Sequence, residues 1–264
     1  MLIDTHCHLS FKAFSDDWRD VINRARSKGI QMITVGSQQK TSEEAITIAN
    51  ESDGVFASIG FHPSHADDDE FNYNWFLENA NNPKVVAIGE CGVEFFRTPE
   101  KEIKEILKKQ EEILRKQISI AKQNDLPVIL HARNSESESI DSSYYHLLRI
   151  IKDENYPKCV VHCYGGTWKE AKDFLDFGCM ISFTGIVTFK NASEDLIETV
   201  KKIPNDKFMI ETDAPYLSPE PHRGEENEPL FVEYVAQGVA QIKNMPYDDI
   251  ASITTKNAKD FFNI

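Results

Sequence analysis

Short runs of apolar residues recur along the chain, and longer segments with a helical pattern of apolar positions separate them. Eight such runs are mostly continuous rather than alternating, and they cover residues 1–5, 31–35, 55–60, 85–89, 127–131, 159–162, 179–183 and 208–212. Continuous apolar runs of this length are typical of strands that are buried on both faces. The pattern therefore predicts a parallel sheet with helices on both sides or around it.

The intervening segments carry helix signals. In residues 16–28 the apolar residues share one face, and Gly29 follows at a position typical of a helix C-terminus. Thr41 with Glu44, and Thr167 with Glu170, each have the spacing of a capping box at a helix start. Further helices are predicted from residue 98 to about 122 and over about 193–203, 229–243 and 247–262.

Eight strands that alternate with helices predict the α/β class and, within it, a (β/α)8 TIM barrel. The alternative is an open, doubly wound sheet, but no glycine-rich phosphate loop follows the first predicted strand. The 264 residues fit one barrel, which usually takes roughly 250 residues. Since no internal repeat or linker is present, we expect one domain over residues 1–264.

Composition limits the function classes. The chain has 29 basic and 43 acidic side chains, a formal net charge of −14, which argues against a basic coat for nucleic acid. It leaves open an enzyme that holds a phosphate through metal ions. No apolar run reaches the roughly 18–20 residues of a membrane span, and the first residues do not resemble a signal peptide. Five cysteines without a paired pattern predict reduced thiols. We therefore expect a cytoplasmic protein that does not enter membranes.

Histidines gather where the predicted strands end. The chain has eight, and six of them follow this rule: His6, His8, His62, His65, His131 and His162. Glu90 follows the fourth predicted strand and Asp213 the eighth. In a barrel, the C-terminal ends of the strands form one face, and that face carries the chemistry. One such histidine alone is more often structural, but the whole set predicts a metal site.

Geometry suggests how the set divides. Residues i and i+2 of a strand project the same way, so His6 and His8 can hold one ion. His131 and His162, on adjacent strands, can hold a second. Glu90 has two oxygens and stands between these groups, so it can bridge. Asp213 can bind the first ion and accept a proton from water.

The same residues carry a resemblance. The segments in question are Asp4-Thr5-His6-Cys7-His8-Leu9, Gly60-Phe61-His62-Pro63, Ile88-Gly89-Glu90, Leu126-Pro127-Val128, His131-Ala132-Arg133, His162-Cys163, Ile181-Ser182-Phe183-Thr184-Gly185, Glu211-Thr212-Asp213-Ala214-Pro215-Tyr216-Leu217, Pro221-His222-Arg223-Gly224 and Asn257-Ala258. In this order and nearly end to end, the chain resembles the TatD family of metal-dependent deoxyribonucleases, within the amidohydrolase-like barrels. Each segment alone is a weak signal, whereas the ordered set is specific.

The resemblance implies two divalent metal ions. The first would lie on His6, His8, Glu90 and Asp213, and the second on Glu90, His131 and His162. Magnesium or manganese is expected to support turnover, while imidazole ligands also suit bound zinc or nickel. Glu90 argues against the related hydrolases that have a carboxylated lysine on the fourth strand.

The resemblance further implies that the substrate is DNA, trimmed from a 3′ end, and the acidic balance favours a pocket that accepts a strand end. Two ions about 3.5–4 Å apart can activate water against a phosphodiester, with Asp213 as the general base. Arg133 suits a phosphate oxygen, or pairs with a loop carboxylate. His62, His65 and Arg223 are further candidates for substrate contacts, although His62 and Arg223 can also stabilise their loops. The protein is expected to be a monomer or weak dimer.

The segment after Glu90 departs from the family pattern. The family usually shows Gly-Leu-Asp-Tyr-Tyr there, and this chain has Gly92-Val93-Glu94-Phe95-Phe96. Glu94 keeps the acid on a longer arm, while Phe95 and Phe96 lack a hydroxyl, so rate or substrate preference can differ. The alternative function is a metal-dependent barrel hydrolase of a small phosphoester, lactone or amide, which the same metal ligands would serve.

Overall fold

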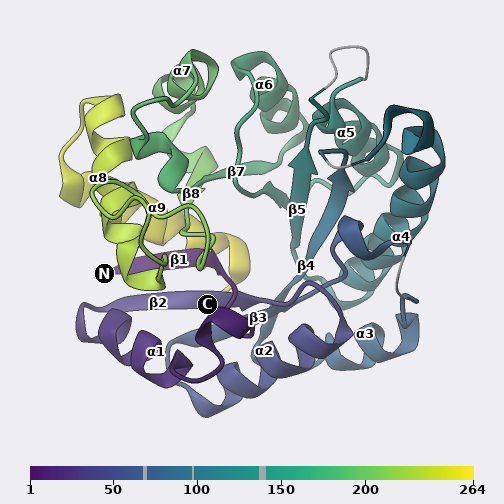
Figure 1. Ribbon diagram of the computed structural model, residues 1–264, viewed down its shortest axis with the longest axis horizontal. Coiled ribbons are helices and arrows are strands. Elements are labelled where there is room, and N and C mark those ends of the chain that lie inside the picture. The colour runs from purple at the N-terminus through teal and green to yellow at the C-terminus, as the bar shows by residue number, and fades with distance from the viewer. Residues whose placement is uncertain (68–69, 97, 137–140) are drawn as a thin grey trace.

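The computed structural model describes residues 1–67, 70–96, 98–136 and 141–264. In these residues eight parallel strands follow one another around a barrel in chain order, as predicted (Figure 1). They are β1 (Leu2–Cys7), β2 (Ile30–Val35), β3 (Val55–Ile59), β4 (Val85–Glu94), β5 (Val128–Arg133), β6 (Cys159–Val161), β7 (Met180–Phe183) and β8 (Phe208–Ile210). The (β/α)8 TIM-barrel fold is thereby confirmed.

The barrel closes between β8 and β1 through the residues just past β8. Asp213 donates its backbone N–H to the carbonyl of His6 at 2.9 Å, and His8 donates to the carbonyl of Ala214 at 2.8 Å. The buried carboxylate of Asp4 accepts from the backbone N–H and the hydroxyl of Thr212, at 2.8 and 2.6 Å. These bonds lie at the C-terminal ends of the two strands, so they fix the first and last strand to each other where the predicted site lies.

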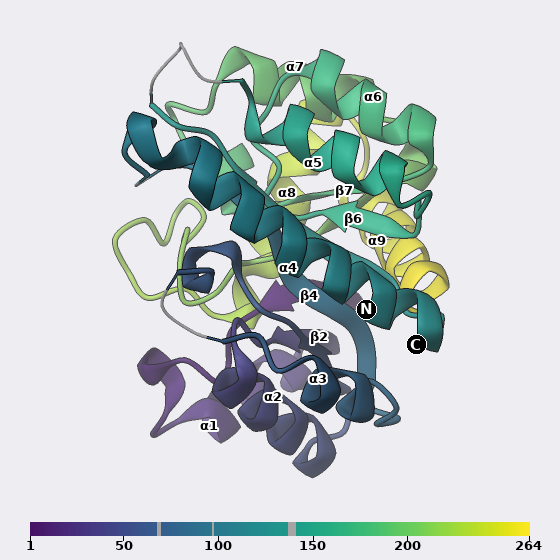
Figure 2. The ribbon, with the colours of Figure 1, turned by 90° about the vertical axis from the view of Figure 1, so that its right-hand side faces the viewer.

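Helices surround the strands, and Figure 2 shows the longest of those described, α4, lying across the outside of the barrel. The helices are α1 (Trp18–Ser27), α2 (Gln39–Glu51), α3 (Tyr73–Asn79), α4 (Ile103–Asn124), α5 (Ser143–Asp153), α6 (Trp168–Phe177), α7 (Glu194–Lys202), α8 (Val232–Lys243) and α9 (Tyr247–Phe262). None of the helices in the described ranges is long and apolar enough to span a membrane.

The apolar core has two parts. The larger part lies between the strands and the surrounding helices, as the buried stripes of those helices require. The smaller part joins buried residues such as Ile3 of β1, Ile129 of β5 and Met209 of β8. Strands from opposite sides can meet only inside the barrel, so this cluster fills the lumen. Phe262 of α9 also belongs to it.

Two helix starts differ from the prediction. The capping box of Thr167 and Glu170 is confirmed, with Glu170 N–H 3.2 Å from the Thr167 hydroxyl. The assignment of Thr41 as a cap is wrong, because α2 begins at Gln39 and the Thr41 hydroxyl instead accepts from Gln38 N–H at 3.1 Å. The helix predicted from residue 98 begins with a 3-10 turn at Glu100–Glu102 and becomes α-helical only at Ile103.

Candidate metal centre

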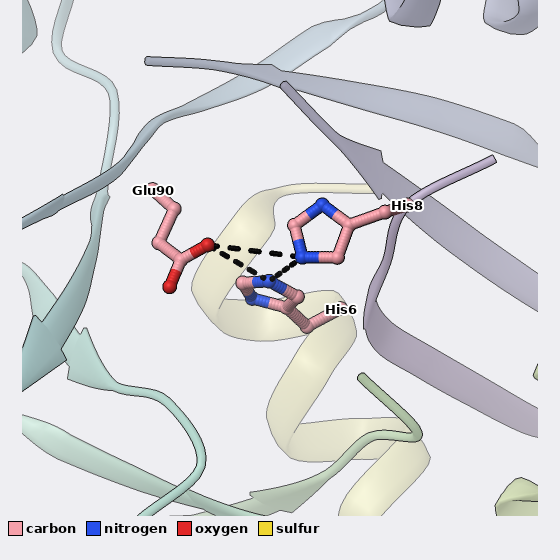
Figure 3. Close-up of side chains that lie close together, drawn as sticks. All are labelled: His6, His8 and Glu90. Atoms are coloured by element: carbon pink, nitrogen blue, oxygen red, sulfur yellow. Dashed lines mark hydrogen bonds and ion pairs between the residues drawn. The ribbon is translucent and has the colours of Figure 1, made fainter. Parts of the chain in front are cut away.

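His6 and His8 come from β1 and the residue after it, and their rings meet, with the two Nε2 atoms 3.2 Å apart (Figure 3). Both side chains are buried. His8 Nδ1 lies 2.8 Å from the carbonyl oxygen of Val35. Because a carbonyl only accepts, Nδ1 must carry the hydrogen, and in the neutral ring Nε2 keeps its lone pair for a metal ion.

Glu90 faces this pair from inside β4, which continues to Glu94 and not to residue 89 as predicted. One carboxylate oxygen, Oε2, lies 3.5 Å from His6 Nε2 and 3.8 Å from His8 Nε2 (Figure 3). The strand approaches β5 closely here because Gly92 has no side chain, and a Cβ at that position would collide with the carbonyl of His131. The sequence thus brings Glu90 and His131 together through a glycine two residues past Glu90.

The second oxygen of Glu90 faces the other histidine pair. Oε1 lies 2.6 Å from His162 Nε2 and 2.8 Å from His131 Nδ1, and these two nitrogens are 3.2 Å apart. Glu90 is 4% exposed, so neither oxygen is occupied by bulk water. One buried carboxylate therefore lies between two histidine pairs, with a separate oxygen towards each.

Asp213 completes the first group from the loop after β8. Its Oδ1 lies 3.4 Å from His8 Nε2 and 3.7 Å from His6 Nε2. The backbone of Asp213 is left-handed, with φ of 58°, a conformation that is uncommon for a residue with a side chain and is held here by hydrogen bonds on both sides. This local conformation aims the carboxylate into the barrel mouth.

The donor atoms fit divalent ions. Four ligands bound tetrahedrally at ordinary zinc distances lie about 3.4 Å from one another. In the first group, the Nε2 atoms of His6 and His8 lie 3.2 Å apart, and each lies 3.4–3.8 Å from an oxygen of Glu90 and of Asp213. In the second group, the facing atoms of Glu90, His131 and His162 are 2.6–3.2 Å apart, which are hydrogen-bond distances that a bound ion would widen. Six residues proposed from the sequence as metal ligands are therefore brought together in two groups that share Glu90.

Two acidic residues lie behind the histidines. Glu211 was not proposed as a site residue from the sequence, and Glu94 was noted there only as a departure from the family pattern. Glu211 is 1% exposed, and its Oε1 lies 3.4 Å from His162 Nδ1 and accepts from Cys163 N–H at 2.6 Å. Glu94 Oε2 lies 3.0 Å from His131 Nε2. The longer arm of Glu94 therefore reaches a ligand. Carboxylates at this position fix ring orientation and tautomer.

Electrostatics follow from burial and crowding. Burial alone would raise the pKa of Glu90, but His162 and the other histidines around it hold that pKa well below its usual range. Burial opposes protonation of His162, yet Glu90 and Glu211 raise its pKa well above the ordinary value. The carboxylate is thus anionic at neutral pH, and a metal ion at the second group must displace a proton from its histidines.

His62 lies at the edge of the centre as a hydrogen-bond donor. Its Nδ1 accepts from Ser64 N–H at 3.1 Å, which assigns the hydrogen of the neutral ring to Nε2, 3.5 Å from Glu90 Oε1. Burial, together with the charge on His131, lowers the pKa of His62 to about 3. A neutral ring with Nε2–H donates to an anion and does not bind a metal ion through that nitrogen.

The other predicted substrate contacts lie on the rim. Arg133, an exposed residue, stacks on Phe96, with its guanidinium carbon 3.8 Å from the ring centroid. Arg223 stacks on Phe189 at the same distance and donates to the Ser218 carbonyl at 3.2 Å, so it braces the loop after β8. His65 packs edge-on against the ring of Phe61.

The comparisons with known proteins identify the family of the chain. A family model described as TatD related DNase matches residues 3–263. An uncharacterized metal-dependent hydrolase of Bacillus subtilis, YabD, is 39% identical over 268 residues that cover all of both chains. The crystal structure of YJJV, a TatD homologue from Escherichia coli, superposes with a TM-score of 0.88 and 27% identity over 100% of this chain and 98% of that one.

More distant structures share the fold alone. A weak promiscuous lactonase template engineered for organophosphate hydrolysis has a TM-score of 0.66 at 11% identity, covering 99% of this chain and 95% of that one. The matching family and its relatives make the protein a metal-dependent hydrolase on a TIM barrel. Within that class the chain belongs to the TatD family.

Proposed function

We propose that this protein is a deoxyribonuclease that uses two divalent ions to hydrolyse DNA phosphodiesters, trimming single-stranded ends from the 3′ side. The observation that carries the proposal is Glu90, whose two oxygens each face a separate histidine pair within 3.8 Å. A shared carboxylate of this kind is how proteins hold two ions close together. The family description as a DNase supplies the substrate class.

The ligand residues divide between the two ions. His6, His8 and Asp213 would hold one, His131 and His162 the other, and Glu90 would contact both. When bound, such a pair of ions lowers the pKa of water and offsets charge on the attacking and leaving oxygens of the phosphodiester.

Asp213 would accept the proton of the attacking water as its oxygen bonds to phosphorus and the bond to the 3′-oxygen breaks. Burial would raise the pKa of Asp213, but His8 and His6 lower it below its usual value, so the residue is ionised at neutral pH and can accept a proton. The left-handed backbone fixes where the carboxylate lies. Asp213 would therefore position the water as well as deprotonate it.

The substrate phosphate would meet two kinds of donor. His62 presents a neutral Nε2–H near Glu90, on the side where a phosphate oxygen would lie. Arg133 stays stacked on Phe96, and stacking leaves its N–H donors at the ring edge available for a phosphate oxygen. The phenylalanine that replaces a tyrosine here thus serves as a platform for that arginine.

The alternative is hydrolysis of a small phosphoester, lactone or amide by the same centre. Its support is the barrel shared with a lactonase template. A panel of such substrates beside DNA separates the two functions, since a true small-molecule hydrolase would turn over one of them faster than any oligonucleotide.

The experiment is the degradation of DNA oligonucleotides labelled at the 3′ or the 5′ end, with magnesium, manganese or a chelator. We expect stepwise loss from the 3′ end that requires metal. Asp213→Asn should lose at least 100-fold in rate while its circular dichroism spectrum is unchanged, since it removes a ligand of the first ion as well as the general base, which alone contributes about 10²–10⁴-fold. Glu228→Gln, which removes one carboxylate paired with Arg24, is the matched control. Intact DNA after incubation with metal-loaded protein would refute the proposal.

A further inference from the structure

A large groove lies beside the metal centre, next to His8, on which its lining residue Phe11 stacks. Its volume is about 1200 Å³, and it runs from the segment after β1 and the loop after β8 over α1 and α2. The residues at its inner end include Phe11 and Tyr216, and those further along include Lys12 and Lys40. None of the proposed metal ligands lines this groove.

Aromatic rings form the inner end of the groove. Phe11 stacks directly on the metal-site residue His8, with ring centroids 4.2 Å apart and planes 9° apart. Tyr216 lies edge-on to Phe11, with centroids 6.3 Å apart. Tyr216 is 54% exposed, which is unusual for a large side chain beside a buried centre. Burial and the negative charges of Asp213 and Glu90 raise the pKa of Tyr216, so its hydroxyl stays protonated beside the anionic centre.

The groove is lined by the three cations Lys12, Arg19 and Lys40 and by four carboxylates, a formal charge of −1, whereas the whole protein carries −14. Glu51 of the groove pairs with Arg19 at 2.6 Å, and Glu225 lies 2.8 Å from the ring of His222. In the described ranges Lys12 and Lys40 form no ion pair within 4 Å, so two cations remain against the carboxylates of Glu44 and Glu226. Lys12 and Lys40 are therefore the cations of the groove that a phosphate can meet without displacing a carboxylate.

We propose that the groove carries the single DNA strand whose end lies at the metal centre, with one base stacked on the ring pair of Phe11 and Tyr216 and with phosphates beside Lys12 and Lys40. Binding of single strands by aromatic platforms next to cations is the general physical solution for sequence-independent recognition. The proposal rests on the proposed deoxyribonuclease function and deepens it, because it names the surface that selects a strand over a small phosphoester.

The test measures the dissociation constant of fluorescent DNA strands of two to eight nucleotides by anisotropy. The full chain carries Asp213→Asn and metal ions, so that bound strands stay intact. We expect affinity to rise with length, and Tyr216→Ala on this background to weaken the octanucleotide about tenfold, since one stacked base contributes about that much. Tyr145→Ala is the matched control, because Tyr145 is 60% exposed, close to the 54% of Tyr216, but lies on α5 outside the groove.

Salt dependence tests the lysines. Each phosphate contact on a single strand contributes about 0.7 to the slope of log affinity against log salt. We expect Lys40→Ala to lower the slope by about that amount, whereas Lys259→Ala, on α9, leaves it unchanged. The proposal that the groove binds the DNA strand would be overturned if affinity did not depend on strand length. It would also be overturned if the Tyr216→Ala and Lys40→Ala proteins bound DNA like their controls.

The two proposals fail separately. If strand binding depends on Tyr216 and Lys40 but the wild-type protein cleaves no DNA, the groove binds the strand and the proposed deoxyribonuclease activity is refuted. Cleavage of the dinucleotide and the octanucleotide with equal kcat/KM would keep the nuclease and refute the groove.

Discussion

Glu211→Gln tests most directly whether the acids behind the metal ligands support metal binding. The side chains have the same shape, and glutamine keeps an oxygen for Cys163 N–H, which Glu211 now accepts at 2.6 Å. Thr5, 3.3 Å from Glu211, has a second acceptor in the Ile210 carbonyl. What glutamine removes is the negative charge that faces His162 Nδ1.

The size of the effect follows from the distances. Removing a carboxylate that orients a metal-bound histidine typically costs 10–100-fold in metal affinity. The separation of 3.4 Å between Glu211 and His162 Nδ1 is long for a charged hydrogen bond, which places the effect at the lower end. We therefore expect about a tenfold loss of affinity at the second ion group, equivalent to about 1.4 kcal/mol.

Isothermal titration of the metal-free proteins with manganese measures this affinity. Glu228→Gln, which loses the same charge at the surface pair with Arg24, should bind manganese like the wild type. Circular dichroism checks that both variants are folded. If folded Glu211→Gln protein binds both ions with wild-type affinity, Glu211 does not position His162, and the reasoning fails.

Three further predictions test other parts of the structure. Metal affinity should rise between pH 5.5 and 8, and titration with the metal across that range measures it. Burial lowers the pKa values of His131 and His162, but the nearby carboxylates raise them above the ordinary value, so both rings hold protons that an ion must displace. Glu111→Gln should lower the free energy of unfolding by roughly 0.5–1 kcal/mol at pH 7. Arg149 lowers the pKa of Glu111 in the folded state, so this difference should shrink as pH falls below about 4, in urea titrations at several pH values. Thr167→Ala should cost about 1 kcal/mol, read as a lower Tm, and an unchanged Tm would contradict its role as a cap.

Much of the fold could be predicted because the strands and helices of a parallel barrel require a simple pattern of apolar residues in the sequence. Strands buried on both faces give continuous apolar runs, and all eight runs correspond to strands. Two helices were not predicted. Tyr73–Asn79 is only seven residues long, too short to show a helical period, and Ser143–Asp153 begins with polar and aromatic residues that are weak helix formers. Thr41 was misassigned because Glu44 copies the spacing of a capping box by chance.

The six ligand candidates could be found from the sequence because strand ends on one face of a barrel must converge. The acids behind them could not. In the sequence, Glu211 looks like any acid near a strand end. In the structure, His6 stacks on His162 with ring centroids 4.1 Å apart, so that Glu211 lies close to both rings. The extension of β4 to Glu94 was also hidden, because Gly89 and Gly92 resemble the end of a strand and instead allow β5 to approach.

The central claim is that Glu90 joins two histidine pairs into one centre for two ions. The most direct test is the number of manganese ions bound per chain, measured by equilibrium dialysis for the wild type, Glu90→Ala and Asp213→Asn. The account predicts two ions for the wild type, loss of tight binding of both in Glu90→Ala, and retention of the ion on His131 and His162 in Asp213→Asn. One ion in the wild type, or two tightly bound ions in Glu90→Ala, would contradict it.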